Sequence, residues 1–269
     1  MLNQSFLKKL KSKYILGRFL KQKAGIKTLP LIYPEKKIFL FVNEKAGCTF
    51  AIKWFFFQQG ILEDALAYDE WIHKYRYDIY YKQDEYRLSF LAIRSNKHVR
   101  IKLVRSPYQR AVSSYIHAIK TNYANQELSE FLNREITPIK TFTFEEFVAF
   151  LEQTGVRKCN PHHRIQTEKA ELNGALKIDR IIRLENAYPE FRRLENEFGL
   201  KASDLESFSQ SLHHRNRVDS NEYCGNKEYP KRERTFSQYQ SFYNDALMKK
   251  IADIYACDFR QYNYPADRL

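Results

Sequence analysis

The sequence predicts an α/β fold with a central parallel sheet, and three short apolar stretches support this prediction. Residues 37–43, 99–104 and 178–184 are rich in aliphatic and aromatic side chains, and charged residues surround them. Short runs of this kind are typical of buried strands. Longer segments with helical patterning separate the three stretches. Strands that alternate with helices favour a parallel sheet with helices on its faces.

Local signals place the helices that follow these strands. We predict helices at 49–60, 108–120, 144–153, 189–198 and 238–255, and one or two more within 63–95. Thr49 is expected to cap the first helix, and Pro107 suits the first turn of the second. Thr143 and Glu146 have the spacing of a capping box. Residues 121–141 are predicted to be a loop or an insertion, and residues 160–168 and 203–234 are predicted to be loops.

Positive charge is concentrated at the N-terminus. The chain of 269 residues has a formal charge of +13, and residues 1–34 contain eight Lys and Arg residues with no Asp or Glu. The remaining 37 basic and 32 acidic residues leave a surplus of only five. We therefore expect a basic N-terminal arm, 1–34, and a single domain, 35–269. The arm is either solvated or an amphipathic helix that contacts a membrane surface.

Other compositional features concern compartment and cofactors. No apolar run approaches the roughly 18 residues of a membrane-spanning helix, and the N-terminus does not resemble a secretion signal. The cysteines Cys48, Cys159, Cys224 and Cys257 are far apart, so a zinc site is not indicated and free thiols are expected. We expect a cytoplasmic protein, peripheral at the inner membrane face if the arm binds lipid.

The loop after the first strand has the composition of an anion site. Gly47 allows a close backbone approach, and the amides of Gly47, Cys48 and Thr49 would point outward at a helix N-terminus. Lys45 adds a full positive charge. The nucleotide-triphosphatase pattern G-x-x-x-x-G-K-[ST] is absent. The alternative is an ordinary loop between two core elements.

A second anion site is predicted where the next strand ends. In VRSPYQRAVSSY, Arg105 ends the strand and Ser113 lies on the following helix. Arg105 can bind a phosphate through two N–H groups, and Ser113 can donate one hydrogen bond to it. Ligands of parallel sheets bind beyond the carboxyl ends of the strands. Two such sites fit a ligand with two phosphate groups.

These two motifs resemble the donor-binding signatures of the sulfotransferases. K-x-G-C-T followed by V-R-S-P-Y-x-R-x-x-S-x-Y is similar to the carbohydrate branch, sulfotransferase family 2, which includes the heparan and chondroitin enzymes and bacterial relatives. The segments PHHRIQTE, RIIRLENAYPEFRRLENEFGL and IADIYACDFRQYNY resemble later parts of that branch. The resemblance implies a three-layer P-loop-like fold, 3′-phosphoadenosine-5′-phosphosulfate as sulfate donor, a carbohydrate acceptor and no metal. It also implies the donor-binding residues Lys45, Ala46, Gly47, Cys48, Thr49, Phe50, Arg105 and Ser113.

The same resemblance suggests catalytic roles. Lys45 would stabilise charge on the oxygen that leaves with the bisphosphate. The proton acceptor stays open among His73, His162 and Glu44, and the family counterparts point first to the two histidines. Two positions depart from the family: Glu44 replaces a proline, and His163 replaces a tryptophan. Both departures concern the acceptor side more than the donor side.

Other functional classes make different predictions. A nucleotide-dependent kinase would need a phosphate loop with Lys after Gly and a magnesium carboxylate, and neither is found. A nucleic-acid-binding protein would need a basic stripe on its body, whereas most of the surplus charge lies in the arm, so no nucleic-acid partner is expected. A fold relative that binds donor or sugar without catalysis stays an alternative. Capsule, polysaccharide or lipopolysaccharide precursors are the expected acceptors.

Overall fold

A computed structural model describes residues 13–209, 217–218 and 222–269. Contacts within the chain divide it into two compact units, which are described separately. The first contains residues 13–43, 47–104 and 167–209, and the second contains residues 44–46, 105–166, 217–218 and 222–269. The first twelve residues of the predicted arm lie outside the described residues, as do residues 210–216 and 219–221 of the predicted loop 203–234.

A four-stranded sheet forms the centre of the first unit. Its order is β1 (Leu31–Tyr33), β2 (Ile38–Val42), β3 (Val99–Val104) and β4 (Arg180–Arg183). β2, β3 and β4 are parallel, which confirms the three strands predicted from the sequence. β1 was not predicted and pairs antiparallel with β2 at the edge. This strand has only three residues with a proline on each side, and proline within sheets is confined to strand ends and edge strands, so its residues offered little indication of a strand.

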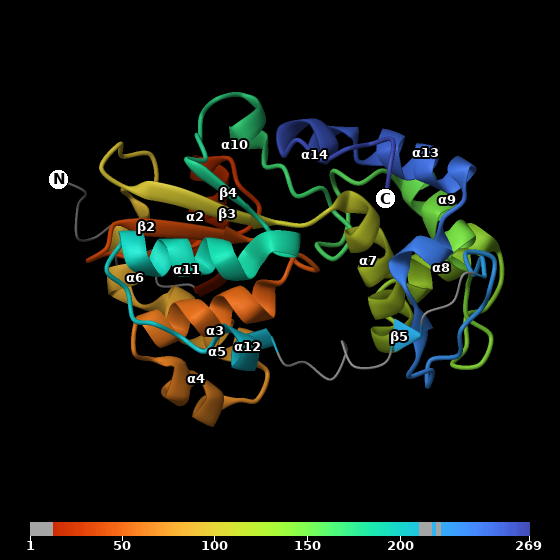
Figure 1. The fold of residues 1–269 in the computed structure, drawn as a ribbon, viewed down its shortest axis with the longest axis horizontal. Coiled ribbons are helices and arrows are strands. Elements are labelled where there is room, and N and C mark those ends of the chain that lie inside the picture. Colours follow the sequence, from red (N-terminus) through yellow and green to blue (C-terminus); the bar gives the residue numbers. More distant parts are fainter. Residues whose placement is uncertain (1–12, 210–216, 219–221) are drawn as a thin grey trace. The chain divides into compact units, whose positions relative to one another are not determined.

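Helices cover both faces of this sheet. Successive side chains of a strand point to opposite faces. Leu103 of β3 approaches Gly47, immediately before α3 (Cys48–Gln58), whereas Lys102 forms a buried ion pair with Glu171 of α10 (Lys169–Leu172). α3 and α10 therefore lie on opposite sides, as Figure 1 shows, and the fold has the predicted layers.

A second helix packs beside α3. In α11 (Ala187–Glu197), the ring of Phe191 meets Trp54 edge-on at 4.6 Å and Phe50 at 5.0 Å. Aromatic pairs of this geometry contribute about 0.5–1.5 kcal/mol beyond the area they bury. α11 was predicted at 189–198 and begins at Ala187, two residues earlier.

Further helices complete the first unit. The segment predicted to hold one or two helices, 63–95, contains α4 (Leu62–Tyr68), α5 (Ile72–Asp78), the 3-10 turn η1 (Tyr80–Lys82) and α6 (Asp84–Phe90). α12 (Leu205–Ser209) lies within the predicted loop 203–234. α2 (Lys13–Ala24) and the residues after it fall within the predicted arm, yet Leu20, Ala24 and Ile26 are buried in the core of the first unit.

The second unit is mainly helical, with its own core around Tyr115 and Phe147. It contains α7 (Pro107–Thr121), α8 (Asn125–Leu132), α9 (Phe144–Thr154), β5 (Arg217–Val218), β6 (Phe236–Ser237), the turn η3 (Tyr239–Phe242), α13 (Asp245–Ile254) and α14 (Ala256–Gln261). The segment 121–141, predicted to be a loop or an insertion, contains the helix α8. Leu128, Phe131 and Leu132 have helical spacing, and Leu128 is fully buried.

The predicted helix 238–255 is shorter than expected. α13 begins only at Asp245, because the side chain of Asn244 accepts a hydrogen bond from the amide of Leu247 and caps the helix there. Residues 239–242 form the 3-10 turn instead. No helix among the described residues combines the length and apolar character needed to cross a membrane. All four cysteines are free thiols.

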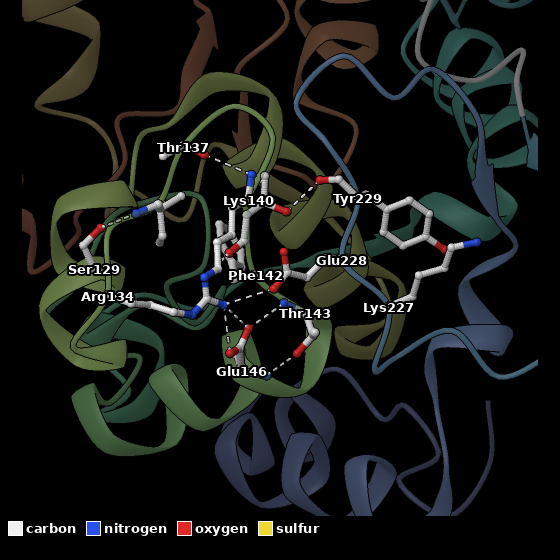
Figure 2. Close-up of polar contacts among 12 residues, drawn as sticks. Ser129, Arg134, Thr137, Lys140, Phe142, Thr143, Glu146, Lys227, Glu228 and Tyr229 are labelled. Atoms are coloured by element: carbon white, nitrogen blue, oxygen red, sulfur yellow. Dashed lines mark hydrogen bonds and ion pairs between the residues drawn. The ribbon is translucent and has the colours of Figure 1, made fainter.

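The predicted capping box of α9 is confirmed and belongs to a larger polar cluster, shown in Figure 2. Thr143 accepts from the amide of Glu146, and the Glu146 carboxylate accepts from the amide of Thr143. Arg134 donates to both carboxylate oxygens of Glu146 at 2.9 Å and to Glu228 at 3.4 Å. The cluster thereby fixes the loop before α9 against the segment that contains Glu228.

Candidate functional site

The loop between β2 and α3 turns sharply at two residues. Lys45 has φ 64° and Gly47 has φ 81°, both in the left-handed region. For a residue other than glycine this conformation costs about 1–3 kcal/mol and is concentrated at functional sites. A Cβ atom on Gly47 would lie 2.5 Å from the Cδ1 of Leu184, so this position requires glycine on steric grounds as well.

α3 begins directly after this turn. Its N-cap is Gly47, and no side chain caps it. The first turn of a helix presents N–H groups that lack intrahelical acceptors, together with the positive end of the helix dipole. Thr49 was predicted to cap the helix, and that prediction is wrong. It lies inside the first turn, where its side chain contacts another residue.

That contact involves His73, one of the two predicted catalytic histidines. The hydroxyl of Thr49 lies 3.1 Å from His73 Nε2, and the sulfur of Cys48 lies 3.8 Å from the same nitrogen. His73 is buried in the first turn of α5. The first unit therefore brings His73 against the start of α3, as expected if both serve one site.

Ala46 and Phe50 can offer only backbone atoms to a ligand. The side chain of Ala46 is fully buried. The ring of Phe50 is buried as well, stacked on Tyr188 at 5.8 Å and packed against Phe191. Their predicted role in donor binding therefore reduces to their amides and to the shape of the loop.

Arg105 follows the last residue of β3 and is held from several sides within the second unit. Its amide donates to Gln166 Oε1 at 2.9 Å, and Gln166 Nε2 donates back to its carbonyl at 2.9 Å. The guanidinium donates to the carbonyl of Lys45 at 3.2 Å and to Gln109 Oε1 at 3.4 Å. Gln109 lies four residues before Ser113 on α7, so these two side chains share one face of the helix.

Arg110, also on α7, holds two loops against this helix. Its buried guanidinium donates to the carbonyl of Glu44 at 3.0 Å and to that of Pro161 at 3.3 Å. Ser114 donates to the carbonyl of His162 at 2.6 Å. Arg110 and Ser114 thus fix the loop that carries Lys45 and the loop that carries His162 to the same helix.

His162 is oriented by its own loop. Its Nδ1 lies 2.8 Å from Asn160 Oδ1, which also accepts from the His162 amide at 3.1 Å. An oxygen that accepts both bonds requires the proton on Nδ1, which leaves the Nε2 lone pair as an acceptor. Burial lowers the pKa of His162 to about 4, and the charges of Lys45 and Arg110 act in the same direction against an opposing effect of Glu44. The ring is therefore neutral at pH 7.

His163 and Glu44 differ from the family pattern in different ways. His163 is buried, and its Nδ1 lies 3.2 Å from the hydroxyl of Tyr123. Burial and the charge of Arg110 lower its pKa to about 4, so it is a neutral core residue. Glu44 Oε2 is buried and has no hydrogen-bond partner among the residues that the structure describes.

Comparison with known families settles the classification. The model of the sulfotransferase family matches residues 31–265 of the chain. This protein belongs to the sulfotransferase family. No curated protein and no solved structure matches it. The family transfers a sulfuryl group, and the mixed α/β architecture with its four-stranded sheet agrees with this assignment.

The predicted site residues of this sulfotransferase fall into two groups. In the first unit, Thr49 and Cys48 meet His73. In the second unit, Arg105 contacts the backbone of Lys45, and Lys45 is close enough to affect the pKa of His162. Among the described residues, no three His, Cys, Asp or Glu side chains gather in a way that could hold a metal ion.

Sequence reasoning missed the residues that hold this site together. Gln109, Arg110, Ser114 and Asn160 had no assigned role, and Gln166 was matched to the family without a contact. The position of Gln109, one helical turn before Ser113 on the predicted helix 108–120, was a usable signal. The other contacts join residues far apart in sequence.

Proposed function

We propose that this sulfotransferase moves the sulfuryl group from 3′-phosphoadenosine-5′-phosphosulfate to a hydroxyl of a carbohydrate. The observation that carries the proposal is the fixed guanidinium of Arg105, directly after β3. Gln109 Oε1 and the Lys45 carbonyl accept hydrogen bonds from this guanidinium, and Ser113 lies one turn after Gln109 on α7. A guanidinium held in this way suits a phosphate monoester, such as the donor's 3′-phosphate, to which Ser113 would donate a further hydrogen bond.

The 5′-phosphosulfate would bind at the loop that follows β2. The left-handed turn at Gly47 and the uncapped first turn of α3 present backbone amides to an anion. Gly47, Cys48, Thr49 and Phe50 contribute these amides, and Lys45 contributes a full charge. These groups supply positive charge where it develops, which is the main requirement for transfer of a group of this type.

In the proposed reaction the acceptor oxygen attacks sulfur, and a new S–O bond forms. The bond from sulfur to the bridging oxygen breaks, and that oxygen leaves with the electron pair as part of 3′-phosphoadenosine-5′-phosphate. Lys45 stabilises the charge on this leaving oxygen. The acceptor proton passes to His162, whose neutral ring presents Nε2 as an acceptor. His73 orients the hydroxyl of Thr49.

Donor binding is the first measurement. Calorimetric titration with 3′-phosphoadenosine-5′-phosphate should give micromolar binding to the wild type, and Arg105→Ala should weaken it at least a hundredfold. Arg260→Ala removes an equal charge from an exposed position on α14 and should bind like the wild type. Lys45→Ala should retain folding but keep less than about a tenth of the sulfuryl-transfer rate. A wild type that does not bind the bisphosphate would contradict the proposal.

A further inference from the structure

Trp71 is unusually exposed for a large aromatic residue. The chain has two tryptophans; Trp54 is 1% exposed, whereas Trp71 is 60% exposed at the start of α5. Tyr68, three residues earlier, is 46% exposed. Neighbouring exposed aromatic rings offer apolar surface that a ligand can cover, and such burial is favourable.

The backbone at Trp71 is fixed. The carboxylate of Asp69 accepts a hydrogen bond from the Trp71 amide at 2.9 Å and from Lys74 Nζ at 2.7 Å. Lys74 Nζ also lies 5.9 Å from the centre of the Tyr68 ring. The two exposed rings are thus accompanied by one carboxylate and one ammonium group. A ring held on a fixed backbone loses little conformational entropy when a ligand binds.

Trp71 lies next to residues of the candidate site. Its ring centre is 5.4 Å from that of His73. His73 in turn contacts Thr49 in the first turn of α3. The exposed indole is therefore connected through His73 to Thr49, to which we assign donor binding. All three residues belong to the first unit.

The chemistry of this surface fits a sugar ring. One face of a pyranose presents C–H groups with partial positive charge, and the face of an indole is negative. Asp69 can accept hydrogen bonds from sugar hydroxyls, and Lys74 can bind hydroxyls or a uronic acid carboxylate. We propose that Trp71 is a stacking platform for one ring of the carbohydrate acceptor, with Asp69 and Lys74 beside it. This inference rests on the proposed function and specifies where its acceptor binds.

Fluorescence quenching can test this inference directly. Acrylamide should quench mainly the exposed Trp71, since Trp54 is buried. The probes are unsulfated oligosaccharides, one neutral and one of alternating glucuronic acid and N-acetylglucosamine, added with 3′-phosphoadenosine-5′-phosphate. At least one should reduce quenching of the wild type several-fold. Trp71→Phe should abolish the protection signal, and Trp71→Ala should weaken oligosaccharide affinity at least tenfold.

Controls separate this inference from the proposed function. Leu88→Ala removes an equally exposed apolar side chain on α6 and should leave oligosaccharide binding unchanged. Trp71→Ala should bind 3′-phosphoadenosine-5′-phosphate within twofold of the wild type. If the bisphosphate binds but no oligosaccharide protects Trp71, or Trp71→Ala binds sugar normally, the platform alone is refuted. If the wild type binds no bisphosphate, the proposed function fails and this inference falls with it.

Discussion

Gln166 shows how one buried side chain can set the position of a candidate site residue, Arg105. The side-chain amide of Gln166 forms hydrogen bonds with both the backbone N–H and the backbone carbonyl of Arg105. The backbone N–H of Gln166 donates to the Asp258 carboxylate at 2.8 Å. All three residues are buried. An amide side chain is suited to this task, because it carries a donor and an acceptor side by side. The direction of the Arg105 side chain thus depends on Gln166.

We expect Gln166→Leu to weaken donor binding, although Gln166 is not proposed to contact the donor. The substitution keeps a similar volume but leaves the buried N–H and C=O of Arg105 without these partners, at a cost of about 1–3 kcal/mol for each unsatisfied group. Calorimetry should show the Kd for 3′-phosphoadenosine-5′-phosphate raised at least tenfold. Gln126→Leu, on the exposed face of α8, is the control. Unchanged affinity in a folded Gln166→Leu variant would contradict this positioning role.

At the scale of elements, the residues at helix ends determine where each helix begins more than the residues in its interior do. The capping box of α9 was readable from Thr143 and Glu146, and the structure has both of its hydrogen bonds. Glu146 also binds Arg134, so the same carboxylate caps a helix and anchors a loop (Figure 2). The cap of α3, in contrast, is Gly47 and not the expected Thr49. That end lacks a side-chain cap where an anion is proposed to bind.

Thr143→Ala should destabilise the protein by about 1 kcal/mol, since it removes the acceptor for the Glu146 amide. Thr143→Ser keeps a hydroxyl and should be nearly neutral. Glu146→Ala should cost more than Thr143→Ala, because it also removes the partner of Arg134. Urea midpoints at constant slope would measure these differences. Equal stability of the alanine and serine variants would show that the cap contributes nothing.

For the whole molecule, stability should depend on two neutral histidines. Burial, assisted by the charge of Arg110, lowers the pKa of both His162 and His163 to about 4. In the unfolded chain the pKa of each is near 6.5. Between these values the unfolded state binds more protons than the folded state, so stability falls as pH drops from about 6.5 to 4. Above pH 6.5 the two groups contribute no pH dependence.

Urea unfolding at pH 7 and pH 4.5 would measure this effect. The wild type should lose stability over this interval, and His163→Gln should lose less, because one of the two titrating groups is gone. Carboxylates with lowered pKa values, such as Asp179, add to the loss in both proteins and cancel in the comparison. An identical loss in wild type and variant would show that His163 titrates normally in the folded state.

The sequence by itself determined the parallel strands, most of the helices and the order of the two motifs for which anion binding is proposed. Each of these features is local: a strand, a cap or a glycine turn is specified by residues within one element. The same local reasoning failed at β1, which is short and flanked by prolines, and at α8, whose apolar positions are few.

Only the tertiary structure decided which residues hold the site. Gln166 and Arg105 are 61 positions apart, and Arg110 joins loops that are 66 and 51 positions away from it. Hydrogen bonds between such distant residues depend on where two loops meet in space, and no periodicity within either segment encodes that meeting. The buried pair of Lys102 and Glu171 and the exposed ring of Trp71 likewise followed from packing. Burial and partners are properties of the folded chain, whereas a sequence pattern describes one element at a time.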